Sequence, residues 1–246
     1  MPFLSVDAPP STQRLADADV APLGMLLADS ARVAMLWAVS DGRALPAGEL
    51  SRAGRVSPSA ASAHLARLVT GGLLSVERHG RHRYYRLVNP AIVNVLEAMA
   101  TVAEPVPAKS LKEAHAASAI RLARTCYDHL AGVLGVSITD ALLKQSALIL
   151  SGREYIITDT GVASLAKLGI DVHRLGETAR RTRRPVTRAC LDWSERRYHI
   201  AGALGATICS RLLELQWLER QPATRALRVT NEGRRALRQH FDVIIA

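Results

Sequence analysis

The chain has 246 residues, of which 48% are hydrophobic, and a formal net charge of +10 at pH 7. Its apolar content is sufficient for a core and argues against a wholly disordered protein. The basic excess suits a polyanionic partner such as nucleic acid. Of the 32 basic residues, 28 are Arg, which contacts phosphates and guanine edges through paired hydrogen bonds, although a GC-rich genome would also explain the excess. Aromatic residues are only 4%, which disfavours single-strand binding by base stacking.

The three cysteines, Cys126, Cys190 and Cys209, are too few and too scattered for a disulfide framework. No run of 18 apolar residues predicts a membrane span. The first 20 residues lack the basic start and apolar block of a signal peptide. We therefore expect a cytoplasmic protein without a membrane partner.

The first half of the chain predicts one compact module at residues 20–103. Residues 1–19 are rich in Pro, Ser and Asp and are expected to form a mobile tail. Ser57-Pro58 is typical of a helix start, and Gly71-Gly72 of a helix end. The expected elements are a helix at 20–40, a short helix at 46–53, a helix at 57–69, strands at 73–78 and 82–87 joined by a turn at His79-Gly80-Arg81, and a helix at 89–103.

The second half, residues 110–246, follows a predicted linker at 104–109 and is expected to begin with a helix that reaches Leu134. It contains an internal repeat at an offset of about 70 residues. The segment His129-Leu130-Ala131-Gly132-Val133-Leu134-Gly135 matches His199-Ile200-Ala201-Gly202-Ala203-Leu204-Gly205. We predict two degenerate winged-helix-like repeats, at about 110–172 and 186–246, each with the order helix, helix, hairpin, helix. The predicted fold class is mainly α with small β-hairpin wings.

The module at 20–103 has the order of a winged helix-turn-helix, in which the second helix of the motif enters the major groove. The small side chains at the start of the helix at 57–69 allow its backbone to approach base edges, and longer ones can reach phosphate or guanine. The hairpin tip is strongly basic and can follow the DNA backbone or a minor groove. The predicted DNA-binding residues are Ser57, Ser59, Ala60, Ser62, His64 and Arg67 on the helix, and Arg78, His79, Arg81, His82 and Arg83 on the wing.

The ordered set of motifs in this module resembles the ArsR-type bacterial transcriptional regulators. The motifs are Leu27-Ala28-Asp29, Arg32, Leu36, Glu49-Leu50, Ser57-Pro58-Ser59, Ser62-Ala63-His64-Leu65, Leu68, Gly72-Leu73-Leu74, Gly80-Arg81 and Tyr84-Tyr85-Arg86-Leu87. The resemblance covers about 80 of the 246 residues. It implies a homodimer on a palindromic operator, with the helices around 23–37 and 90–102 at the dimer interface. The C-terminal region looks like the tail of long members of the family.

The usual metal sites of that family are missing from the first module. Residues 49–54 contain no Cys, and residues 89–103 contain no His and no Asp. The resemblance alone therefore does not identify a metal inducer, and we leave the metal question open.

Three features of the C-terminal region are candidates for sensing. Cys126 and His129 are three residues apart and would share one face of a helix, and Cys190 and His199 could face them if the two repeats pack with pseudo-twofold symmetry. These four residues could react with a thiol-directed signal or hold a metal. Cys126 could also be a simple buried hydrophobe. A second candidate is a small-molecule pocket lined by Tyr127, His129, Trp193, Arg196, Arg197 and His199, although Trp193 could equally anchor a surface helix start. The third is the basic run Arg180–Arg188, which either contacts phosphate or forms a solvated loop.

No phosphate loop, zinc-protease or nucleophile-elbow motif appears, so we do not expect an enzyme. We predict a sequence-specific regulator of transcription that binds double-stranded DNA. We expect a homodimeric repressor that responds, through its C-terminal region, to a small-molecule or thiol-reactive signal. The alternatives are a non-specific nucleoid-type protein, or a metal-responsive repressor that uses the C-terminal Cys and His residues. No cofactor is firmly predicted.

Overall fold

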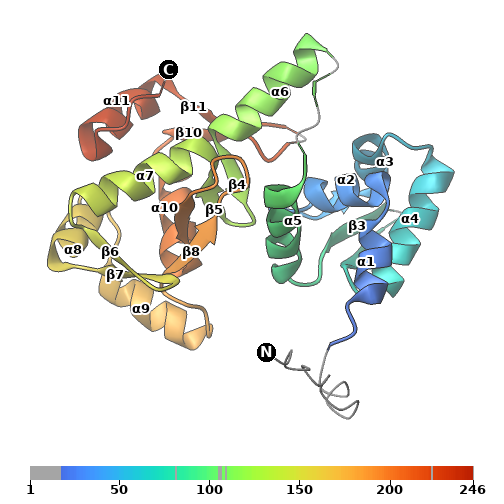
Figure 1. Cartoon of the computed structure of the whole chain (residues 1–246), viewed down its shortest axis with the longest axis horizontal. Coiled ribbons are helices and arrows are strands. Elements are labelled where there is room, and N and C mark those ends of the chain that lie inside the picture. The colour runs from blue at the N-terminus through green and yellow to red at the C-terminus, as the bar shows by residue number, and fades with distance from the viewer. Residues whose placement is uncertain (1–17, 81, 105–106, 109, 223, 246) are drawn as a thin grey trace, which may run out of the picture.

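The structure is a computed structural model that describes residues 18–80, 82–104, 107–108, 110–222 and 224–245. Its N-terminal winged helix-turn-helix and its two C-terminal repeats form two groups, with α5 (Ala91–Val102) on the side that faces the repeats (Figure 1). The predicted fold class is confirmed: the chain is mainly helical, with small antiparallel hairpins. Most of the tail predicted at 1–19, and part of the linker predicted at 104–109, lie outside the described residues.

The N-terminal group is a helix-turn-helix followed by a β-hairpin and a closing helix. The hairpin strands pair antiparallel, with Val76 opposite Tyr85, and a short first strand completes the sheet in the order β1-β3-β2. The elements before α5 are α1 (Ala21–Leu27), α2 (Ser30–Ala38), β1 (Leu45–Pro46), α3 (Ala47–Gly54), α4 (Pro58–Thr70), β2 (Leu74–His79) and β3 (His82–Leu87).

The single helix predicted at 20–40 is wrong, because the chain breaks between α1 and α2. Asp29 is the N-cap of α2, and its carboxylate accepts a hydrogen bond from the backbone N–H of Arg32. The Arg32 guanidinium donates to the carbonyls of Met25 and Leu26 at the end of α1. One buried Arg thus satisfies carbonyls that a continuous helix would have paired internally.

The C-terminal group is built from two copies of one sequence of elements: helix, hairpin, helix, hairpin, helix. The first copy comprises α6 (Leu111–Leu122), β4 (Arg124–Cys126), β5 (His129–Ala131), α7 (Gly132–Lys144), β6 (Leu148–Ser151), β7 (Glu154–Ile157) and α8 (Asp159–Ala166). The second comprises α9 (Val172–Arg181), β8 (Arg188–Leu191), β9 (Tyr198–Ala201), α10 (Gly202–Glu214), β10 (Leu218–Arg220), β11 (Leu227–Val229) and α11 (Asn231–Phe241).

The helix predicted from 110 to Leu134, and the order helix, helix, hairpin, helix, are therefore wrong. The β4–β5 hairpin interrupts the helical pattern, and its tight turn places Tyr127 in the left-handed region at φ 58°. The duplication itself is clear, since α7 and α10 begin 70 residues apart on Gly132 and Gly202, both at φ 80°.

The two repeats cross over one another, which brings their first hairpins together. Helix α7 packs on β9 of the second repeat, α10 packs on β5 of the first, and β5 contacts β9. Gly135 and Gly205 lie at this junction, and the hairpins that precede them exclude a side chain: a Cβ on Gly135 would lie 2.6 Å from the carbonyl oxygen of Leu130, and one on Gly205 would lie 2.3 Å from that of Ile200. The crossing places two histidines from equivalent positions opposite each other.

The repeats share one apolar core, and the winged module has a second one. The second core does not end at the winged module, because Cys126 and Ala131 of the β4–β5 hairpin are buried within it. Among the described residues, no helix is both long and apolar enough to cross a membrane.

Candidate functional site

The predicted recognition helix, α4, has one buried face and one exposed face. Its buried residues are Ala61, Leu65 and Leu68. Ser57 is the N-cap, as the sequence predicts, and its hydroxyl accepts a hydrogen bond from the N–H of Ala60. The exposed face is made of small or basic side chains at Ser59, Ser62, Ala63, Ala66 and Arg67. This face has the shape and the donors that close approach to base edges requires.

His64 is set differently from its neighbours on α4. Its Nδ1 lies 3.7 Å from the Asp29 carboxylate at the start of α2, and its side chain is only 19% exposed. It is therefore turned toward the start of α2 rather than fully toward solvent. Its predicted contact with DNA stays a prediction.

The wing carries exposed basic and imidazole side chains at Arg78, His79, His82 and Arg83. Arg78 lies opposite Arg83 across the hairpin, and His79 lies opposite His82. Arg81, at the tip, lies outside the described residues. The described wing residues place positive charge at the end of the sheet, where a phosphate backbone would attract it.

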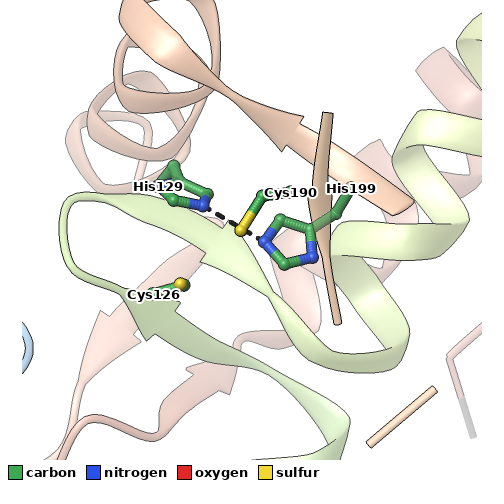
Figure 2. A group of neighbouring side chains, drawn as sticks. All are labelled: Cys126, His129, Cys190 and His199. Atoms are coloured by element: carbon green, nitrogen blue, oxygen red, sulfur yellow. Dashed lines mark hydrogen bonds between the residues drawn. The ribbon is translucent and has the colours of Figure 1, made fainter. Parts of the chain in front are cut away.

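Cys126, His129, Cys190 and His199 form one cluster at the junction of the two repeats (Figure 2). Their ligand atoms all lie within 4.8 Å of one another. Cys126 is paired with His129 across the β4–β5 hairpin, and Cys190 with His199 across the β8–β9 hairpin. The expected placement of Cys126 and His129 on one helix face is therefore wrong, since β-pairing brings them together instead.

Each histidine of the cluster has a carboxylate behind it. His129 Nδ1 lies 3.5 Å from Asp128 Oδ1, and His199 Nδ1 lies 3.3 Å from Asp192 Oδ2. Burial would raise the pKa of Asp192, but His199 and the charge of Arg124 outweigh it and hold that pKa well below its usual range. The pKa of Asp128 is lowered in the same way: burial alone would raise it, but His129 and Arg184 lower it to about 2. Both carboxylates are thus charged at neutral pH.

A buried charge network joins this cluster to the winged module. Arg124, which is fully buried, lies 3.0 Å from Asp192 and 3.4 Å from Glu97 of α5. Glu97 also lies 2.8 Å from Arg225, whose guanidinium sits 4.2 Å from the ring centre of Trp37 in α2. The path from His199 through Asp192 and Arg124 to Glu97 is therefore continuous.

The comparison with curated proteins decides the family. The chain is 43% identical over 227 residues to the uncharacterized HTH-type transcriptional regulator YdfF of Bacillus subtilis, across 92% of this chain and 99% of that protein. The chain belongs to the HTH-type transcriptional regulators. No family model matches this regulator.

Solved structures resemble parts of the regulator. NolR from Sinorhizobium fredii is 24% identical, with a TM-score of 0.35, over 39% of this chain and 96% of that chain. The homodimeric winged helix-turn-helix DNA-binding domain Mb0332 from Mycobacterium bovis, described as a possible ArsR-family transcriptional regulator, is 27% identical. It has a TM-score of 0.34 over 39% of this chain and 89% of that chain.

The other residues proposed for sensing in this HTH-type regulator do not gather in one pocket. A cleft of about 410 Å³ is lined by Tyr127, His129 and Cys190, together with Arg183, Arg184 and Arg188. Trp193 instead packs against Arg124, with the guanidinium 5.0 Å from its ring centre. Arg197 pairs with Asp140 at 2.6 Å, and Arg196 is exposed in the loop between β8 and β9. Trp193 also lies in this loop, so the helix start expected there as an alternative is wrong.

The basic run at Arg180–Arg188 divides between three environments. Arg180 and Arg181 end α9, and Arg183 is exposed after it. Arg184 makes two hydrogen bonds to the Asp128 carboxylate, at 2.6 and 2.9 Å.

The sequence does not predict the roles of Asp128, Asp192, Arg124 and Glu97, because no local pattern marks charges that pair across distant parts of a chain.

Proposed function

We propose that this HTH-type regulator binds a specific double-stranded DNA sequence as a homodimer and represses transcription there in the cytoplasm. The observation that carries the proposal is the exposed face of α4. It presents small side chains and Arg67 beside a basic wing, so backbone and side chains can both reach the major groove.

In the proposed homodimer, the partner chain would pack on α1 and α5. Val95, Met99 and Val102 follow one side of α5 and are 47%, 46% and 85% exposed, while Leu23 and Met25 of α1 are 41% and 69% exposed. Apolar groups so exposed on the first and last helices of the winged module favour burial against an identical face.

The C-terminal repeats would supply the response to a signal. They touch the winged module through the β4–β5 hairpin and Glu97 of α5. An effector that prefers one position of α5 would change the spacing of the two α4 helices and so shift the population of DNA-competent dimers.

Selection from fragmented genomic DNA with the purified full chain tests the proposal. At a salt concentration that suppresses non-specific binding, we expect one inverted repeat to be enriched, with half-sites about 10 base pairs apart or a multiple of that. Uniform recovery of fragments at every salt concentration would contradict the proposal and would be typical of a nucleoid-type protein.

A further inference from the structure

We propose that Cys126, His129, Cys190 and His199 bind one zinc ion between the two C-terminal repeats. The proposal concerns a site that the DNA-binding function neither requires nor uses directly. It depends on the geometry of the cluster alone, and a failure of DNA binding would leave it standing.

The spacing of the ligand atoms fits a tetrahedral ion. His129 Nε2 and His199 Nε2 lie 3.1 Å apart, and two nitrogens on one tetrahedral zinc ion lie about 3.3 Å apart when each Zn–N bond is about 2.05 Å. The cysteine sulfurs lie within 4.8 Å of these nitrogens and of each other. Two thiolates and two imidazoles are a common donor set of structural zinc sites.

The carboxylates behind the histidines supply the second reason. Nδ1 of each imidazole faces a carboxylate, at 3.5 Å for Asp128 and 3.3 Å for Asp192, which favours the proton on Nδ1 and leaves Nε2 free to bind a metal. Both Nε2 atoms then carry lone pairs, which point at each other in a buried space. Two lone pairs 3.1 Å apart repel unless a proton or a metal cation lies between them. A metal ion held also by two thiolates meets that need.

The cysteines favour a metal over a redox switch. Cys126 is 1% exposed, and Cys190 is only partly accessible. Oxidants and electrophiles reach a thiol buried in this way poorly, whereas a metal ion that enters the cluster displaces the thiol protons and binds the thiolates. His129 and Cys190 also line the cleft of about 410 Å³, which gives an ion a way in.

A closed set of four protein ligands holds the metal without an open position for a substrate. The ion would therefore fix the two first hairpins of the repeats together. Because Asp192 contacts both His199 and Arg124, the ion would also set the position of the charge network that reaches α5. This last consequence rests on the proposed function.

Metal analysis of the purified full chain tests the site. We expect about one zinc ion per chain by mass spectrometry of the metal, and at least a tenfold loss in Cys190→Ser, whose side chain is partly accessible. Cys209→Ser is the matched control, since Cys209 is a buried thiol outside the cluster, and it should keep the metal. Co²⁺ added to chelator-treated wild type should give the absorption of a tetrahedral, thiolate-bound ion.

The Co²⁺ measurement uses wild type only, so it remains decisive if Cys190→Ser fails to fold. The proposal is overturned if chelator-treated wild type, with its thiols reduced, takes up neither zinc nor Co²⁺. It is equally overturned if Cys190→Ser retains zinc, or if Co²⁺ binds without thiolate charge-transfer absorption.

Discussion

Substitution of Glu97 by Gln is expected to lower the free energy of unfolding by about 3–5 kcal/mol. The change keeps the shape of the side chain but removes the carboxylate that lies 2.8 Å from Arg225 and 3.4 Å from Arg124. Arg124 would keep its ion pair with Asp192, whereas Arg225 would lose its ion pair with Glu97. An unpaired charge of this kind is costly because neither water nor a counter-ion reaches it.

Urea denaturation of wild type and Glu97→Gln measures this loss. Glu214→Gln is the matched control, because Glu214 pairs with Arg211 on the exposed surface of α10 and should cost at most about 1 kcal/mol. The double variant Glu97→Gln/Arg225→Met should be more stable than Glu97→Gln alone, since it removes the charge left without a partner. Equal costs for Glu97→Gln and Glu214→Gln would show that the network is not buried in solution.

Substitution of Ser62 by Glu is expected to weaken binding to the selected DNA sequence by about a hundredfold or more. Ser62 lies on the exposed face of α4, where its hydroxyl donates to the carbonyl of Pro58 one turn earlier. A Glu there places a negative charge against the phosphates and base edges, and like charges in such a contact cost several kcal/mol. Glu is a good helix former, so α4 itself should persist.

Fluorescence anisotropy with the labelled sequence measures the effect. Ser118→Glu makes the same chemical change on an exposed position of α6, away from α4, and should leave the affinity within about threefold of wild type. If Ser62→Glu binds as tightly as Ser118→Glu, α4 does not enter the DNA.

The winged module could be predicted closely because its signals are local. Ser57-Pro58 starts α4, and the predicted second strand, 82–87, matches β3. The β4–β5 hairpin could not be predicted, because Leu122, Leu130 and Val133 keep helical spacing. The turn of this hairpin also uses Tyr127 rather than a Gly or Asn. The hairpin is also held by contacts that are distant in the sequence, since β5 packs on β9 and α10 of the second repeat.

The sequence predicts which residues of the Cys-His cluster correspond to each other, but not that all four meet. The repeat offset identifies His129 with His199 and, after a local insertion, Cys126 with Cys190. That they converge depends on the crossing of α7 and α10 over each other's hairpins, which no local pattern encodes. The role of Glu97 is invisible for the same reason, since Arg124 and Arg225 are 27 and 128 residues away from it.

The most direct test of the account is the affinity of the full chain for its selected DNA sequence, with and without bound zinc. We expect the two affinities to differ by at least fivefold, as is typical of coupled sites, because the cluster, Asp192, Arg124 and Glu97 form one connected path to α5. The difference should disappear in Cys190→Ser and persist in Cys209→Ser. Equal affinities for zinc-loaded and zinc-free wild type would contradict the claim that the C-terminal repeats control DNA binding through this site.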